Sequence, residues 1–266
     1  MKKFKLLFKE KPVIGMIHLR ALPGTPLYDG NLEQIVEYAR NDLSALQSAG
    51  IDAILFCNEN DRPYELIVDQ ASVATMSYVI GCLKKEIRVP FGVDVLWDPV
   101  ATMALAAATG AQFVREVFVG LFASDMGLWG GRAAEALRYR KRLMCDNVLV
   151  FCNICAELSS ALDTRSIQER AKSAVFSSLI DAVLISGPMA GVPPSLEILS
   201  TIKECLPDIP VLANTGVRHD TVAEILKVAD GVIVGTALKK DGKTWNPVDQ
   251  ERAKQFMEIV RKTRQN

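Results

Sequence analysis

Polar and ionisable residues stand at or just after the ends of most short apolar runs in this chain. They are His18, Asn58, Glu59, Asp61, Asp94, Arg115, Glu116, Glu157, Ser186 and Asn214. Imidazole, carboxyl and guanidinium groups exchange protons with a substrate or stabilise charge that develops on it. If the fold brings these runs together, the catalytic candidates are His18, Asp94, Arg115 and Glu157.

Three carboxylates also predict a metal site, formed by Glu59, Asp94 and Glu116. Carboxylates gathered at one place repel each other unless a positive group joins them. A divalent cation, Mg²⁺ or Mn²⁺, would serve, and so would Arg115 or a protonated carboxyl group. Because Arg115 and Glu116 are adjacent, only one of them points inward from a regular strand, and we favour Arg115 together with Asp94.

Glycine-bearing turns follow two consecutive apolar runs near the C-terminus. The run VLAN leads to Gly216, and the run GVIV leads to Gly235 and Thr236. Backbone N–H groups at such turns can approach a phosphate because no side chain blocks them. We therefore expect Gly216, Gly235 and Thr236 to bind phosphate, with Lys239 as a charge partner. The alternative is that both glycines only make tight turns.

Helical segments alternate with the apolar runs. The expected strands cover residues 12–19, 51–57, 91–95, 112–119, 148–154, 181–185, 210–214 and 231–234. Leu32, Ile35 and Val36 begin an apolar stripe at helical spacing after the first strand. A helix is also expected over about 64–85, and another after Thr221, where Glu224 predicts a capping box.

Eight strand–helix units within 266 residues predict a single α/β domain, the (β/α)8 or TIM barrel, with residues 1–11 as a leading segment. In that fold the C-terminal ends of all strands meet at one mouth, so the polar residues would converge there. An open dinucleotide-binding sheet is the alternative, but no GxGxxG motif follows the first strand. The segment 120–131 has glycines near both ends and is expected to close over the mouth as a lid.

Charge and composition exclude several classes of partner. The formal net charge is 0, so the chain has no excess of positive charge with which to bind nucleic acid. No apolar run is long enough to span a bilayer, and we expect no membrane insertion. The six cysteines lie mostly in apolar runs, as reduced thiols of cytosolic proteins do, so a cytoplasmic protein is expected.

Several long motifs, all in the same order, resemble the BtpA/SgcQ family. They are GMIHLRALPGTP, FCNENDRP, GVDVLWDPVATMALAAATGAQFVREVFVG, ASDMGLWGG, DGVIVGTALKKDG and NPVDQERAKQFM, between about residues 11 and 262. The VLWDP and ASDMGLW segments are most similar to the SgcQ-type members, which are associated with sugar-transport operons. The resemblance implies a cytoplasmic (β/α)8 barrel with a phosphate-site signature and, on the BtpA side, a role in photosystem I biogenesis or stability.

The motif positions complete the set of expected substrate-binding residues. These are Asn58, Asp61, Asp125, Gly187, Asn214, Gly216, Gly235, Thr236 and Lys239. Asp94 stands where the family form has asparagine, which adds a negative charge at the mouth. The first functional hypothesis is an enzyme acting on a small phosphorylated metabolite, a sugar phosphate, by isomerase, epimerase or lyase chemistry. The alternative is a non-catalytic assembly or stability factor, and in either case a homo-oligomer is expected.

Overall fold

Eight parallel strands close into a barrel in the order β1-β11-β10-β9-β7-β4-β3-β2. The computed structural model describes residues 1–8, 10–189 and 191–265. The barrel strands are β1 (Val13–His18), β2 (Ala53–Cys57), β3 (Phe91–Asp94), β4 (Phe113–Glu116), β7 (Leu149–Asn153), β9 (Ala182–Ser186), β10 (Val211–Asn214) and β11 (Gly231–Val234). The predicted TIM barrel is thereby confirmed.

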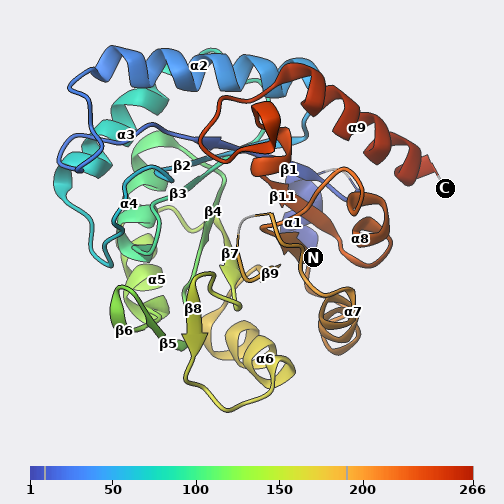
Figure 1. Ribbon diagram of the computed structural model, residues 1–266. Coiled ribbons are helices and arrows are strands. Elements are labelled where there is room, and N and C mark those ends of the chain that lie inside the picture. The colour runs from blue at the N-terminus through green and yellow to red at the C-terminus, as the bar shows by residue number, and fades with distance from the viewer. Residues whose placement is uncertain (9, 190, 266) are drawn as a thin grey trace.

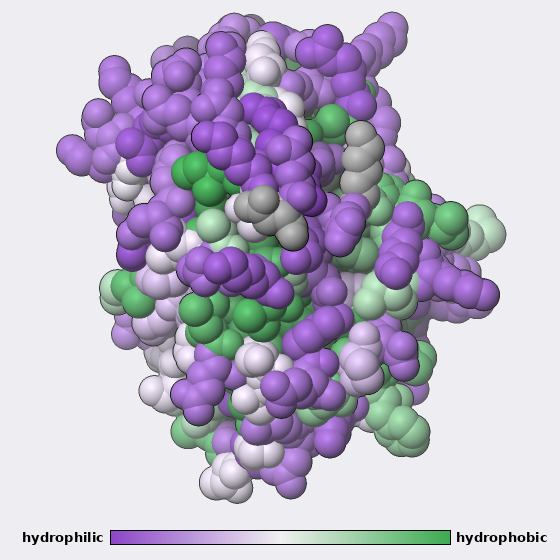
Figure 2. Space-filling model, turned by 90° about the vertical axis from the view of Figure 1, so that its right-hand side faces the viewer, coloured by the Kyte–Doolittle hydropathy of each residue, from purple (hydrophilic) through white to green (hydrophobic). Residues whose placement is uncertain are grey.

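Helices surround these strands as a ring (Figure 1). They are α2 (Leu32–Ala49), α3 (Gln70–Leu83), α4 (Pro99–Thr109), α5 (Ala133–Arg142), α6 (Ile167–Ser178), α7 (Leu196–Cys205), α8 (Val222–Val228) and α9 (Gln250–Gln265). In the described residues no helix is long and apolar enough to cross a membrane. Hydrophilic side chains cover most of the face drawn in Figure 2, with hydrophobic ones gathered across its middle.

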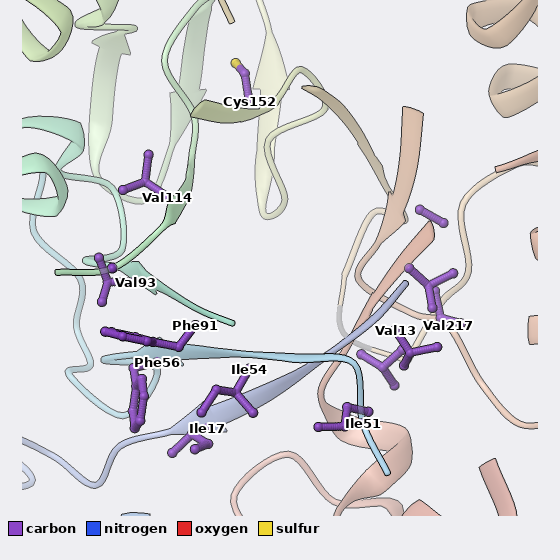
Figure 3. Close-up of a cluster of buried hydrophobic side chains, with 14 of the residues drawn as sticks. Val13, Ile17, Ile51, Ile54, Phe56, Phe91, Val93, Val114, Cys152 and Val217 are labelled. Atoms are coloured by element: carbon purple, nitrogen blue, oxygen red, sulfur yellow. The ribbon is translucent and has the colours of Figure 1, made fainter. Parts of the chain in front are cut away.

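Strand side chains alternate between two apolar layers, because successive residues of a strand point to opposite faces. Ile17, Ile54 and Phe56 belong to the layer between strands and helices, and Figure 3 shows them on neighbouring strands. Met16 and Leu55 belong to the layer inside the barrel. The same alternation turns the inward positions at the strand ends toward the barrel mouth, and several of these positions carry polar or ionisable residues, such as His18, Arg115 and Asn214.

The leading segment closes the opposite end of the barrel. It contains the short helix α1 (Lys2–Leu7), drawn near the centre of the ring in Figure 1. The Phe4 ring centroid lies 5.8 Å from that of Phe151, and the Phe8 ring centroid lies 5.4 Å from that of Phe113. Both aromatic partners point into the barrel, so α1 covers the end at which the strands begin.

Two helix boundaries differ from the sequence prediction. Helix α3 begins at Gln70 rather than near residue 64, because Asp69 caps it by accepting a hydrogen bond from the Ala71 N–H at 2.6 Å. The predicted capping box at α8 is wrong. Thr221 is the N-cap but makes no side-chain capping bond, because its hydroxyl accepts the Arg218 N–H at 3.0 Å instead.

The segment expected to be a lid loop is part of a small antiparallel sheet. Strands β5 (Leu121–Ser124) and β6 (Gly127–Gly130) form a hairpin, and β8 (Ser159–Ala161) pairs with β5. The Trp129 ring stacks on Phe122 with centroids 4.6 Å apart and meets the edge of Trp97 at 5.4 Å. These contacts pack the hairpin against the loop after β3, so it supports one wall of the barrel mouth.

Candidate functional site

A cavity of about 380 Å³ opens at the mouth of the barrel, where the strands end. Its lining residues with imidazole, carboxyl or guanidinium groups are His18, Glu59, Arg62, Arg115 and Glu157. They come from β1, the loop after β2, β4 and the loop after β7, which lie far apart in the sequence. The barrel therefore brings together side chains that the sequence predicted to converge.

Glu157 is the centre of a hydrogen-bond network across the mouth. Its side chain accepts from Arg115 Nη2 at 2.8 Å, Asn153 Nδ2 at 2.8 Å, Ser186 Oγ at 3.0 Å, Asn214 Nδ2 at 3.3 Å and Thr215 Oγ1. These donors lie on β4, β7 and β9 and at the end of β10. Glu157 therefore ties neighbouring strand ends together through Oε1, which accepts four of these bonds, while Oε2 accepts only the one from Asn153.

Arg115 lies between two carboxylates inside the barrel. Its Nη1 donates to Asp94 Oδ2 at 2.8 Å while its Nη2 donates to Glu157. Burial raises the pKa of Asp94 to about 6, although the guanidinium of Arg115 opposes that shift. Asp94 Oδ1 and Arg115 Nε are buried and have no hydrogen-bond partner among the described residues. Asp94 is fully buried and, unlike Arg115, is not among the residues that line the cavity.

Glu59 is the carboxyl group of the cavity with the fewest partners. Its only side-chain hydrogen bond in the described chain is the weak one that Cys57 Sγ donates at 3.7 Å. Burial raises the pKa of Glu59 to about 7, against the opposing charge of Arg115. A carboxyl group whose pKa lies near the working pH is suited to both giving and taking protons. The sequence suggested Glu59 only as a metal ligand, but its spacing of two residues from the inward-facing Cys57 indicates an inward position.

His18 presents a neutral imidazole to the cavity. Burial and then the charge of Lys239 lower the pKa of His18 to about 3, so the ring is uncharged near neutral pH. Its Nδ1 is buried without a partner in the described residues. A Cβ on Gly235 would lie only 2.9 Å from His18 Cε1, so a side chain there would displace the ring. The absence of a side chain at Gly235 therefore leaves the space that the His18 ring occupies.

Glu116 points away from the cavity, as the alternation along β4 requires. Its Oε2 accepts the Trp97 N–H and its Oε1 accepts the Val117 N–H, both at 2.7 Å. It therefore holds the loop after β3 and is not brought to Glu59 and Asp94. Within the described ranges no group of three or more His, Cys, Asp or Glu residues is arranged to hold a metal ion. These residues do not fit an Mg²⁺ or Mn²⁺ centre.

Asn58 and Asp61 fasten loops beside the cavity. Asn58 Nδ2 donates to Asp61 Oδ2 at 3.0 Å, and Asn58 Oδ1 accepts the Leu96 N–H at 2.8 Å. Asp61 Oδ1 accepts the Leu22 N–H at 2.8 Å. Together they tie the loops after β1, β2 and β3 to one another, and neither side chain lines the cavity.

Lys239 does not lie at the cavity, where the sequence analysis expected it as a charge partner of a bound phosphate. Its ammonium group donates to Asp42 Oδ2 on α2 at 2.6 Å, and both side chains are 1% exposed. It pairs with a helix of the outer ring and is not among the residues that line the cavity. Asp125, in the turn between β5 and β6, does not line the cavity either.

The two glycine turns do lie at the cavity. Gly216, Gly235 and Thr236 all line it, and Gly216 has φ +81°, a conformation that favours glycine. Their N–H groups donate no hydrogen bond to any other described part of the chain. Gly187 does not line the cavity; like Gly216, it leaves room for the Val192 carbonyl oxygen, which a Cβ would strike.

Aromatic residues complete the lining and were not anticipated as site residues. Tyr64, Trp97 and Trp245 face the cavity from the loops after β2, β3 and β11. Trp97 follows β3 within VLWDP, so its place directly after a strand end was the available signal. Trp245 lies eleven residues beyond the end of β11. The expectation that residues directly after a strand lie at the barrel mouth therefore does not apply to it.

An eight-stranded parallel barrel with a cavity at the C-terminal ends of its strands defines a TIM-barrel protein with a ligand-sized site at its mouth. Within that class, the chain belongs to the BtpA family, whose model matches residues 9–262. The resemblance read from the sequence motifs is thus confirmed.

Two relatives and one solved structure illustrate these similarities. The chain is 47% identical to SgcQ, an sgc region protein of Escherichia coli, over 94% of each chain. It is 32% identical to the photosystem I biogenesis protein BtpA of Synechocystis sp., covering 97% of this chain and 90% of that one. It shares the fold of thiamine phosphate pyrophosphorylase from Pyrococcus furiosus, with a TM-score of 0.57, 17% identity, and coverage of 97% and 98%.

Proposed function

We propose that this protein is an enzyme that acts on a small phosphorylated metabolite, of the sugar-phosphate class, by isomerase, epimerase or lyase chemistry. The observation that carries the proposal is a single cavity in which, among the described residues, the Glu59 carboxyl is nearly unpartnered and three N–H groups on glycine turns are unpaired. The first group suits proton transfer and the second suits an anion.

The phosphate would bind at the turns after β10 and β11. The N–H groups of Gly216, Gly235 and Thr236 would supply the donors, and the two glycines carry no side chain that competes for the space. TIM-barrel proteins frequently bind phosphate at the corresponding loops. Since Lys239 is paired with Asp42, the charge of the phosphate would be balanced by backbone dipoles and by Arg62 or Arg115.

Proton transfer would take place on the Glu59 side of the cavity. Isomerases, epimerases and many lyases share a step in which a C–H bond next to a carbonyl group breaks. The proton passes to the Glu59 carboxylate, and the electron pair moves to the carbonyl oxygen. A neutral His18 and the guanidinium of Arg115, which both line the cavity, would stabilise that oxygen, as preorganised donors do in oxyanion sites.

Ligand-dependent thermal stability tests the phosphate site. A sugar phosphate at about 100 times its Kd adds about 2.7 kcal/mol to the free energy of unfolding. Gly235→Asp should abolish that stabilisation, because it places a negative charge at the turn and presses on His18. Gly81→Asp is the matched control, since a Cβ there meets nothing within 4 Å. Undiminished binding of every stabilising sugar phosphate to Gly235→Asp would show that the phosphate site is misassigned.

Turnover of the ligand found in that screen tests the role of Glu59. Glu59→Gln keeps the shape of the side chain but cannot accept the proton. It should retain binding and lose about 10²–10⁴-fold in kcat, the usual contribution of a general acid or base. Full activity of Glu59→Gln would exclude the carboxyl as the proton acceptor.

A non-catalytic assembly or stability role is the second candidate, because one relative is the photosystem I biogenesis protein BtpA. In that case the cavity chemistry would be dispensable. Glu59→Gln and Gly235→Asp would then leave the cellular function intact, while substitutions on the outer surface would abolish it. Complementation of a deletion strain with the two sets of variants separates the candidates.

A further inference from the structure

Three aromatic rings line the cavity and have no role in binding phosphate or moving protons. We call this set the aromatic wall, and it consists of Tyr64, Trp97 and Trp245. The remaining lining next to it is also largely apolar, with Leu96, Leu158, Met189 and Ile233. A simple sugar phosphate, with hydroxyl groups on most carbons, would leave this apolar surface without a matching partner.

Trp97 is fixed in place and offers an unused donor. It is 7% exposed, has φ +69°, and is held by the bond from its N–H to Glu116 and by the edge contact with Trp129. A positive φ is uncommon for a bulky residue, and such conformations concentrate at ligand sites. Its indole Nε1 is buried without a hydrogen-bond partner in the described ranges. A ligand heteroatom at the wall would satisfy that group.

Trp245 is the exposed face of the wall. Its side chain remains 45% exposed, although a large ring is normally covered in a folded protein. The Arg62 guanidinium carbon lies 3.7 Å from the Trp245 ring centroid. Since β1 lies between β2 and β11 in the barrel, this stack joins the loops on either side of β1, above His18. A ring and a guanidinium arranged in this way form a platform on which a planar group can stack.

We infer that the substrate carries a planar heterocycle of the nucleobase kind, attached to its phosphorylated sugar, and that this ring stacks on the aromatic wall. The ring lies against Trp245 and Trp97, the sugar lies beside Glu59, and the phosphate reaches the Gly216 and Gly235 turns. A cavity of about 380 Å³ falls within the roughly 300–1,000 Å³ range of small-molecule sites, which accommodates a ligand of this size. The inference rests on the proposed function, whose substrate class it narrows.

Isothermal titration calorimetry with defined probes tests the inference. The probes are the four common ribonucleoside monophosphates, the matching unphosphorylated nucleosides, and ribose phosphate. At least one nucleoside monophosphate should bind at least about tenfold more tightly than ribose phosphate. Trp245→Ala should weaken that nucleotide about 5- to 150-fold, the range measured for one base–aromatic stack, and leave ribose phosphate unchanged. Trp245→Phe, which keeps a ring, should retain most of the affinity.

Two further variants separate ligand contact from packing. Trp97→Phe removes the indole N–H but keeps an aromatic ring against Trp129, and it should weaken the nucleotide. Trp129→Phe is the matched control, because Trp129 packs in the same aromatic cluster without lining the cavity. Its nucleotide affinity should stay within about twofold of the parent, as expected for a residue that touches no ligand.

The outcomes distinguish the inference from the proposal on which it rests. If ribose phosphate binds as tightly as every nucleotide and Trp245→Ala changes neither, the heterocycle inference is overturned while the phosphate site stands. If nucleosides and nucleotides bind equally well and Gly235→Asp has no effect, the phosphate site is overturned while the aromatic wall stands. If none of the probes binds, both are overturned.

Discussion

Replacing Lys239 by methionine should destabilise the protein without weakening phosphate binding. Lys239 Nζ donates to Asp42 Oδ2 at 2.6 Å, and each side chain is 1% exposed. Removing one partner of a buried ion pair leaves an uncompensated charge and costs about 3–5 kcal/mol. Asp42 keeps one other bond, because its Oδ1 accepts the Val248 N–H at 2.6 Å. We therefore expect the free energy of unfolding to fall by about 3 kcal/mol, the lower end of that range.

Urea denaturation of the parent and Lys239→Met measures this loss as a fall in the midpoint at unchanged m. In the double variant Asp42→Asn/Lys239→Met no buried charge remains, and the amide oxygen can still accept the Val248 N–H. Much of the lost stability should return, because neutral replacements of a buried pair are often tolerated. The double variant therefore controls for loss of packing at Lys239.

The competing view is that Lys239 is a charge partner of the bound phosphate, as its distance from the last strand suggested. That view predicts near-normal stability and a weakened sugar-phosphate affinity in Lys239→Met. A loss of stability below about 1 kcal/mol, within the range of an exposed pair, would refute the reasoning from the buried pair. Affinity for the stabilising ligand should instead stay within about twofold of the parent.

Two further predictions concern the polar and the apolar parts of the barrel interior. Burial raises the pKa of Glu59 from 4.5 to about 7, so between these pH values the folded protein binds more protons than the unfolded chain, and the free energy of unfolding falls as the pH rises. Glu59→Gln should remove up to about 3 kcal/mol of that fall, measured by urea titrations at about pH 5 and pH 8. An unchanged difference in the free energy of unfolding between the two pH values would contradict the assignment. Phe8→Ala should cost about 3–5 kcal/mol, because its ring packs on Phe113 and Phe151 where α1 closes the barrel, whereas Phe176→Ala on the 88% exposed surface of α6 should stay within about 0.5 kcal/mol.

The sequence predicted the barrel well because the fold is encoded in local patterns. Short apolar runs alternate with helical segments, and Asn31 and Asp98 cap α2 and α4 through side-chain hydrogen bonds. The same alternation identified the strand ends as the place where polar residues meet. A predicted helix start was wrong where a residue expected inside the helix caps it instead, as Asp69 caps α3.

The site was harder to predict because it depends on which way each side chain points and on what it meets. Lys239 stands near the phosphate turn in sequence, yet its amine contacts Asp42, 197 residues away. Glu59 and Glu157 are both glutamates in loops after barrel strands, but within the described part of the chain the Glu59 side chain has a single weak partner and that of Glu157 has five. Only the three-dimensional arrangement separates a free carboxyl from one that holds the network.

The two halves of the cavity are positioned by adjacent residues of one strand. Arg115 points into the barrel and links Asp94 to Glu157, which orders the polar half. Glu116 points outward and accepts the N–H of Trp97, which orders the aromatic half. Because the two side chains leave β4 on opposite faces, a shift of that strand by one residue would exchange them and disrupt both halves together. The pairing of β4 with β3 and β7 therefore fixes how Trp97 lies relative to Arg115 and its two carboxylate partners.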